Sequence, residues 1–375
     1  MKGKVIILKT TTAYYKNFEG DSYQIGVLLG KWALSQPEML KAMLLPLNAY
    51  PQKKLQKITE LLDKYCRGIN EEIQGFADTV GIERGQALFY AMTYLERGCS
   101  LMAALPAKTE EEHTILARNY EFSDVMEELC FVHTKTAGKY KHLGSMINLF
   151  GRGDGMNEYG LAVAQASCGM PVGNFEGGQR PAVTGLQFWV VIRGILENCK
   201  NIEEAVAYCI KVPIGYNMNL MLADKSGKIA LFECIDGHKA YKLLDNQTEE
   251  TVLSVTNHAV LAELKPFEKA VLENSVIRNN LILDFSHTRE KLTKTDIKDL
   301  LSAPYPHGLC CHYYGDFFGT LRSMIFDVTV GQVEMTFGSP QQNDWQSFTF
   351  ASQKDLEFSV QLPYEQTPKN FYNIF

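Results

Sequence analysis

Cys99 stands in the segment E-R-G-C-S at 96–100, where a mostly helical pattern gives way to a strand pattern. Nineteen residues later the chain reads R-N-Y-E at 118–121. A Gly-Cys step at such a boundary suggests a cysteine that becomes a new N-terminus. That residue would carry both a nucleophile, its thiol, and a general base, its freed amine.

The other eight cysteines are expected to be small buried hydrophobes. The cluster of His307, Cys310, Cys311 and His312 invites a zinc interpretation, but metal spacing usually needs two separated ligand pairs. The sequence offers no convincing second pair. We therefore predict core thiols here, with no metal and no cofactor.

Composition limits the function classes. A chain of 375 residues with 46% hydrophobic residues can bury a large core without disulfides or metal. The net charge of −6 and the lack of a dense basic stripe disfavour a nucleic-acid partner. The run of apolar residues near the N-terminus is too short for a signal peptide or a membrane span. An odd number of cysteines fits a reducing compartment, so we expect a cytoplasmic protein.

Hydrophobic periodicity predicts the elements that position these residues. We expect a strand or hairpin over 4–18, strands at 114–117, 146–150, 160–164, 220–224, 228–233, 253–255, 320–327, 331–337 and 346–350, and helices over 22–35, 52–80, 83–96, 183–211 and 262–304. Residues three apart on a strand point to opposite faces, so Arg118 and Glu121 should do so. Alternating blocks of this kind suit one layered α+β domain over 1–375.

Five short motifs occur in an order that resembles a known family. They are S-Y-Q-I-G at 22–26, G-C-S at 98–100, R-N-Y-E at 118–121, G-M-N-E-Y-G-L at 155–161 and T-N-H at 256–258. The chain resembles the acyl-coenzyme A:6-aminopenicillanate acyltransferase (isopenicillin N acyltransferase-like) group of N-terminal-nucleophile hydrolases. This group is related to choloylglycine hydrolases and penicillin V acylases. The resemblance implies a four-layer αββα sandwich.

The resemblance also implies roles for individual residues. Cleavage between Gly98 and Cys99 would divide the chain into residues 1–98 and 99–375. An acid at the position of Glu121 holds the nucleophile's amine, although most relatives have Asp there, and the residue at the position of Arg118 lies near the thiol. Asn257 would supply an amide N–H to the oxyanion.

Some assignments stay open at this stage. The second oxyanion donor is expected near Gln165 and Ser167. Many relatives carry an arginine where Cys311 aligns, and Arg322 is a candidate to replace it in space.

The predicted activity is cleavage of a linear carbon–nitrogen amide bond through a Cys99 thioester. The substrate would be a small N-acyl amide or acyl thioester. Water as second acceptor gives hydrolysis and an amine gives acyl transfer. Two alternatives remain. The first is an impaired, uncleaved member that binds a small ligand. The second is a Cys-His thiol hydrolase that uses His258 or His312 without autocleavage. Whether the chain forms a homo-oligomer is open.

Overall fold

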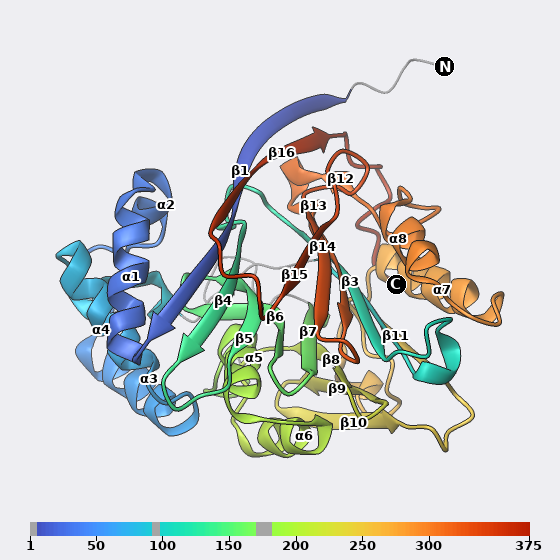
Figure 1. The fold of residues 1–375 in the computed structure, drawn as a ribbon, viewed down its shortest axis with the longest axis horizontal. Coiled ribbons are helices and arrows are strands. Elements are labelled where there is room, and N and C mark those ends of the chain that lie inside the picture. The colour runs from blue at the N-terminus through green and yellow to red at the C-terminus, as the bar shows by residue number, and fades with distance from the viewer. Residues whose placement is uncertain (1–5, 92–97, 170–181) are drawn as a thin grey trace.

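The computed structural model describes residues 6–91, 98–169 and 182–375. Two β-sheets pack face to face between two groups of helices, which gives a four-layer αββα sandwich of the α+β class (Figure 1). The helices are α1 (Ser22–Leu34), α2 (Pro37–Ala42), α3 (Gln52–Tyr65), α4 (Ile69–Val80), α5 (Phe188–Asn198), α6 (Ile202–Lys211), α7 (Glu273–His287) and α8 (Lys294–Ser302).

The first sheet has nine strands in the order β10-β9-β8-β7-β6-β5-β4-β1-β16. Its strands are β1 (Ile7–Gly20), β4 (Cys130–Thr136), β5 (His142–Ile147), β6 (Gly151–Asn157), β7 (Leu161–Ser167), β8 (Met218–Asp224), β9 (Lys228–Ile235), β10 (His238–Leu244) and β16 (Leu356–Tyr364). The pairing of β1 with β4 is parallel and the other pairings are antiparallel. Strand β1, from the N-terminal segment, therefore lies between two strands from later in the chain, β4 and β16.

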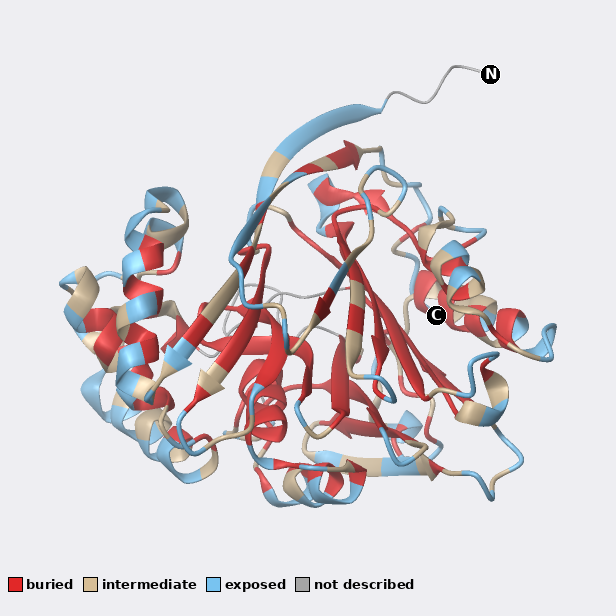
Figure 2. Ribbon diagram, in the orientation of Figure 1, coloured by how far each residue is buried: buried red, intermediate tan, exposed pale blue. Residues whose placement is uncertain are grey.

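The second sheet has seven strands in the order β11-β2-β3-β13-β14-β15, with β12 paired to β13. Its strands are β2 (Ser100–Ala104), β3 (Ile115–Phe122), β11 (Val252–Val255), β12 (His312–Tyr313), β13 (Phe318–Asp327), β14 (Gln332–Phe337) and β15 (Gln346–Thr349). Strands β2 and β3 lie against β7 and β8 of the first sheet, while α7 and α8 cover the opposite face. Figure 2 shows buried residues concentrated in the two sheets and on the helix faces turned toward them.

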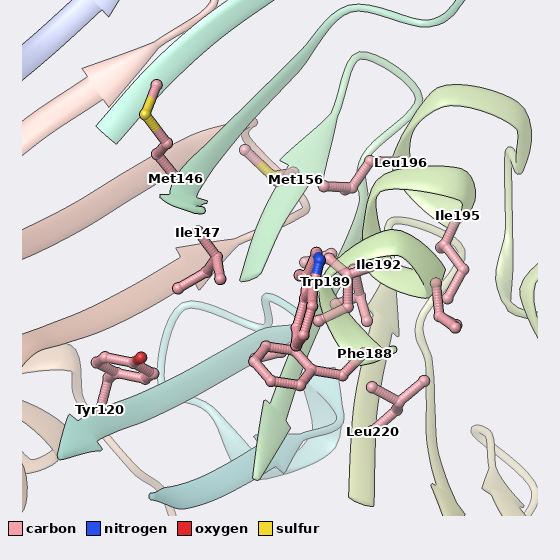
Figure 3. Close-up of a cluster of buried hydrophobic side chains, with 14 of the residues drawn as sticks. Tyr120, Met146, Ile147, Met156, Phe188, Trp189, Ile192, Ile195, Leu196 and Leu220 are labelled. Carbon is pink, nitrogen blue, oxygen red and sulfur yellow. The ribbon is translucent and has the colours of Figure 1, made fainter. Parts of the chain in front are cut away.

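Helix α5 anchors the core beneath the first sheet. Figure 3 shows Trp189 and Phe188 of α5 among side chains of several strands, with Tyr120 of the second sheet nearby. The contact with β6 is so close that a Cβ at Gly151 would lie 2.4 Å from Trp189 Cδ1. Only glycine fits there, because a side chain would displace the tryptophan.

Several predicted boundaries are corrected by the structure. The single helix expected over 52–80 breaks between α3 and α4, where Gly68 has a φ of +87°. That left-handed conformation interrupts the helix. Residues 83–91 form short 3-10 turns at Arg84–Gln86 and Leu88–Ala91 instead of an α-helix, and the rest of that predicted helix, 92–97, lies outside the described residues.

Other predicted blocks are subdivided. The 183–211 block divides into α5 and α6, and the 262–304 block contains α7 and α8, preceded by a 3-10 turn at Lys265–Phe267. Strands β2, β4, β6, β10, β12 and β16 lie outside the predicted strands, and 148–150, the end of the strand predicted over 146–150, form a turn. Helix α1 is confirmed, since Asp21 caps it in a reciprocal capping box with Gln24. Within the described ranges, no helix is long and apolar enough to cross a membrane.

Candidate active site

The thiol of Cys99 contacts a buried arginine. Cys99 is fully buried directly before β2, and Arg118 Nη2 lies 2.8 Å from its Sγ. A guanidinium at this distance stabilises the thiolate form of a cysteine relative to the thiol. The residue that the sequence singled out therefore has an electropositive partner at its reactive atom.

Arg118 is positioned by both sheets. It lies on β3, which pairs with β2, and its Nη1 donates to Asp154 Oδ2 at 3.0 Å on β6 of the facing sheet. Asp154 is itself held by Ser145 Oγ, which donates to Oδ1 at 2.6 Å. The position of the Cys99–Arg118 contact thus depends on how the two sheets face each other.

The backbone of Cys99 is held by two further side chains. Its N–H donates to Asn257 Oδ1 at 3.2 Å, and its carbonyl oxygen accepts from Arg278 Nη1 at 2.7 Å. Arg278 also donates to Ser100 Oγ at 2.9 Å and to Asn257 Oδ1 at 2.8 Å. This guanidinium is fully buried and connects the cysteine with the asparagine.

Arg278 was missed by the sequence analysis. It lies on α7, where Asn274 one turn earlier accepts from its Nη2 at 2.8 Å. Polar residues four apart on the buried face of a helix are unusual, since that face is normally apolar. The polar pair Asn274 and Arg278 was the signal that the sequence offered. The residues that Arg278 contacts could be identified only from the packing of α7 on the second sheet.

Asn257 follows β11 in a tightly held loop. Its Nδ2 donates to Ser167 O at 3.0 Å and lies 3.1 Å from Ser167 Oγ. The loop beyond it is fixed by two carboxylates, because Glu268 accepts from Ala259 N–H and Glu233 accepts from Val260 N–H. Burial raises the pKa of both Glu233 and Glu268 to about 7. At the Asn257 side chain itself, the contacts with Ser167 and Arg278 turn Oδ1, and not Nδ2, toward the Cys99 N–H.

Glu121 lies on the other face of β3 from Arg118, as their spacing predicts. Its Oε1 accepts from Thr320 Oγ1 at 3.1 Å, while its Oε2 is buried with no hydrogen-bond partner among the described residues. Burial raises the pKa of Glu121 to about 7, opposed by the nearby charges of Arg278 and Arg118. The site therefore holds a buried carboxyl group with one oxygen, Oε2, that accepts no hydrogen bond from the described residues.

Gly98 packs directly against this carboxyl side chain. A Cβ at Gly98 would lie 2.6 Å from Glu121 Cβ and 2.9 Å from Phe318 Cε2. Real Cβ atoms essentially never approach so closely. Any larger residue at 98 would have to displace Glu121 or Phe318.

Two other predicted residues, Arg322 and Gln165, lie on β13 and β7. Arg322 on β13 pairs with Glu127 at 2.6 Å and lies 3.5 Å from Asp154, with its guanidinium 3.7 Å from the Tyr120 ring centroid. It shares Asp154 with Arg118, and the arginine recorded on the Cys99 carbonyl is Arg278. Gln165 is buried on β7, two residues before Ser167.

The two histidines of the alternative thiol mechanism have other partners. His258 Nδ1 lies 2.8 Å from Ser275 Oγ, and burial lowers the pKa of His258 to about 4. His312 Nε2 lies 3.3 Å from Cys310 Sγ, and its Nδ1 lies 3.1 Å from Glu365 Oε1. In the part of the chain that the structure describes, no group of three His, Cys, Asp or Glu residues is arranged to hold a metal ion.

The family model described as acyl-coenzyme A:6-aminopenicillanic acid acyl-transferase matches residues 108–342. The match covers more than half of the chain, so the chain belongs to this family of acyl-transferases. The resemblance found in the sequence is thereby confirmed. No curated protein matches the chain.

Solved structures overlap with the chain only partly. A mutant of conjugated bile acid hydrolase from Clostridium perfringens is 11% identical and covers 72% of this chain and 100% of its own, with a TM-score of 0.45. Penicillin V acylase from Agrobacterium tumefaciens is 16% identical, with 70% and 90% coverage and a TM-score of 0.45. A Caenorhabditis elegans ortholog of N-acylethanolamine-hydrolyzing acid amidase is 15% identical, with 62% and 93% coverage and a TM-score of 0.42.

Proposed function

We propose that this chain is a self-processing N-terminal cysteine hydrolase or acyltransferase that cleaves a linear amide through a thioester on Cys99. One observation carries the proposal. The Sγ, N and O atoms of Cys99 are each held by a buried polar side chain, from Arg118, Asn257 and Arg278 respectively. A thiol that only fills a core needs none of these partners.

Maturation would proceed by an N-to-S acyl shift. The Cys99 sulfur attacks the Gly98 carbonyl carbon, the peptide C–N bond breaks, and the thiol proton moves to the departing nitrogen. Water then hydrolyses the thioester, which releases the Gly98 carboxylate and restores the thiol. Residues 1–98 and 99–375 would be the two products of the single domain 1–375.

The lack of a hydrogen-bond donor to Glu121 Oε2 among the described residues supports this step. A buried carboxylate oxygen without a donor is costly, typically by about 1–3 kcal/mol. Cleavage would convert the Cys99 amide into an amine beside the site of Gly98, which packs against Glu121. We infer that the new ammonium group donates to Glu121 Oε2. The cleaved state would then satisfy an oxygen that no described residue of the uncleaved chain pairs.

The mature amine would act as the general base. An unperturbed α-amine has a pKa of about 7.7–8, so it can take the thiol proton near neutral pH. The thiolate attacks the substrate carbonyl, and the Asn257 amide donates to the oxyanion once Ser167 Oγ turns away from it. The protonated amine returns its proton to the leaving nitrogen. Water or an amine then accepts the acyl group from Cys99.

An apolar acyl group fits the surroundings of the site. A pocket of about 440 Å³ is lined by Met39, Met43, Val125 and Met126. Glu127, which also lines it, accepts from the hydroxyl of Tyr120 at 3.0 Å, and the Tyr120 ring centroid lies 4.9 Å from Arg118 Cζ. The pocket is therefore two contacts away from the residue that touches the thiol.

Intact-mass measurement of the purified protein tests the proposal. We expect a 98-residue and a 277-residue chain, since 375 − 98 = 277, and a single uncleaved chain for Cys99→Ala. The two chains should co-purify, because β1 lies between β4 and β16 and the buried Arg193 pairs with Glu72 across the division. Cys209→Ala, which changes a buried cysteine on α6, is the control and should still be cleaved. A wild-type protein that stays whole would remove the self-processing claim.

A further inference from the structure

Strand β13 is irregular beside Glu121. Thr320 pairs with Glu121 and Arg322 pairs with Tyr120, so Leu321 is an extra residue on β13. Residues two apart on a regular strand share a face. The bulge turns Thr320 and Arg322 to opposite faces, and such bulges commonly re-aim a side chain next to an active site. Strand β13 therefore places Thr320 on the face of the sheet that carries Glu121, and Arg322 on the face that carries Tyr120.

The two faces have different tasks. Arg322 lies against the Tyr120 ring and Asp154, in the network that holds Arg118. Thr320 lies on the face of Glu121 and is, among the described residues, the one whose side chain is recorded as donating a hydrogen bond to it. The bulge is what allows both contacts from the same short stretch.

The direction of the Thr320 hydroxyl is fixed by its own partners. Its Oγ1 accepts from the Cys311 N–H at 2.9 Å, and the Thr320 N–H donates to Cys311 O at 2.7 Å. With a lone pair engaged by Cys311, the hydroxyl hydrogen is directed at Glu121 Oε1. A hydrogen bond to an ionised acceptor is stronger than one to a neutral group.

The charged and titratable groups around Glu121 come from β3, α7, the loop before β12 and the 3-10 turn at Tyr314–Asp316, which contributes Tyr314. Arg118 on β3 and Arg278 on α7 favour the ionised carboxyl, and burial opposes it. Cys310 and Cys311 precede β12, and burial raises the pKa of the Cys310 thiol to about 12. That thiol is also in hydrogen-bond reach of the Thr320 hydroxyl, but it stays neutral near pH 7 and is a weaker acceptor than the Glu121 carboxylate.

We propose that Thr320 is a positioning residue whose hydroxyl holds Glu121 Oε1, so that Oε2 stays free to receive the Cys99 amine. This inference rests on the proposed function. It assigns to a β-bulge the task of orienting the carboxyl group that anchors the N-terminal nucleophile. It also explains why a strand that supplies Arg322 to one face supplies Thr320 to the other.

The first test needs no catalysis. In the uncleaved Cys99→Ala protein, the protonation of Glu121 is followed through the infrared carbonyl band of its neutral acid, assigned by its loss in Glu121→Gln. Thr320→Val removes the hydroxyl at nearly constant shape, whereas Thr320→Ser keeps it. Because a hydrogen bond to the charged form lowers a carboxyl pKa, Thr320→Val should raise the midpoint by about one pH unit. Thr320→Ser should titrate like the parent.

The second test uses the cleaved enzyme. Thr320→Val should lower kcat by about tenfold to a hundredfold with KM little changed, and Thr320→Ser should retain most activity. Equal midpoints for the Val and Ser variants, or an unchanged kcat in Thr320→Val, would overturn the inference. If Thr320→Val does not fold, Thr320→Ala replaces it. Because the infrared titration uses a protein without the nucleophile, its result is independent of whether Cys99 is cleaved.

Discussion

Arg278 offers the sharpest test of the site, because its guanidinium makes four hydrogen bonds there and no role was predicted for it from the sequence. Its guanidinium donates to Cys99 O, Ser100 Oγ, Asn257 Oδ1 and Asn274 Oδ1 at 2.7–2.9 Å. Arg278→Met keeps the length of the side chain and removes every donor. Arg278→Lys keeps the charge, but one ammonium cannot reproduce the planar fork of donors.

The expected losses can be worked out from these contacts. Asn257 Oδ1 keeps the Cys99 N–H as donor, and the Ser100 hydroxyl can turn, so Cys99 O and Asn274 Oδ1 lose most. At about 1–3 kcal/mol for each unsatisfied buried group, Arg278→Met should lower the free energy of unfolding by about 3 kcal/mol. Because Asn257 loses its anchor, kcat should fall by about 10²-fold or more.

The assay combines urea unfolding, intact mass and steady-state hydrolysis of an N-acyl anilide. Arg289→Met is the matched control, since Arg289 follows the same helix, is 41% exposed and pairs with Asp296 at 3.6 Å. An exposed pair of this kind contributes about 0–1 kcal/mol, so the control should be cleaved and active. Arg278→Met protein with wild-type stability, cleavage and kcat would refute the role of Arg278.

Four further results are expected. Glu121→Gln should move the acidic limb of the pH–rate profile to lower pH and reduce kcat, because a nearby anion raises the pKa of the amine it holds; superimposable profiles would make Glu121 a bystander. Asn257→Ala should lower kcat by about 10²–10³-fold and also lower the free energy of unfolding, because the Cys99 N–H and Ser167 O lose a buried partner; a kcat near wild type would remove it from the site. Gly98→Ala should block or slow cleavage on an intact-mass time course, since its Cβ would lie 2.6 Å from Glu121 Cβ, and cleavage at the wild-type rate would contradict the packing. Burial raises the pKa of Glu128 from 4.5 to about 7, so the folded state keeps a proton that the unfolded state releases in this window. The free energy of unfolding should therefore fall as the pH rises from 4.5 to 7, and urea titrations of Glu128→Gln should show a flatter dependence.

The strand and helix pattern predicted much of the fold, and the misses have local causes. The helix boundary at Asp21 is confirmed because a capping box is a short-range interaction. The break at Gly68 was missed because glycine inside an apolar helical pattern does not reveal its backbone angle. Strand β16 was missed because a partly exposed strand has weak apolar alternation, and its pairing with β1 joins residues more than 300 positions apart.

The sequence by itself determined the residues that local chemistry can mark. These are the Gly98-Cys99 step and the placement of Arg118 and Glu121 on opposite faces of one strand, whereas the role predicted for Asn257 rests on the family resemblance. Side-chain direction along a strand follows a period of two and needs no tertiary information.

Only the tertiary structure decided which distant groups meet around Cys99. Arg278 reaches it because α7 packs on the second sheet, and Asp154 reaches Arg118 because the two sheets face each other. The bulge at Leu321, which aims Thr320 at Glu121, exists only in the register between β3 and β13. Such contacts depend on how separate elements pack, and the spacing of residues along one element carries no record of that packing.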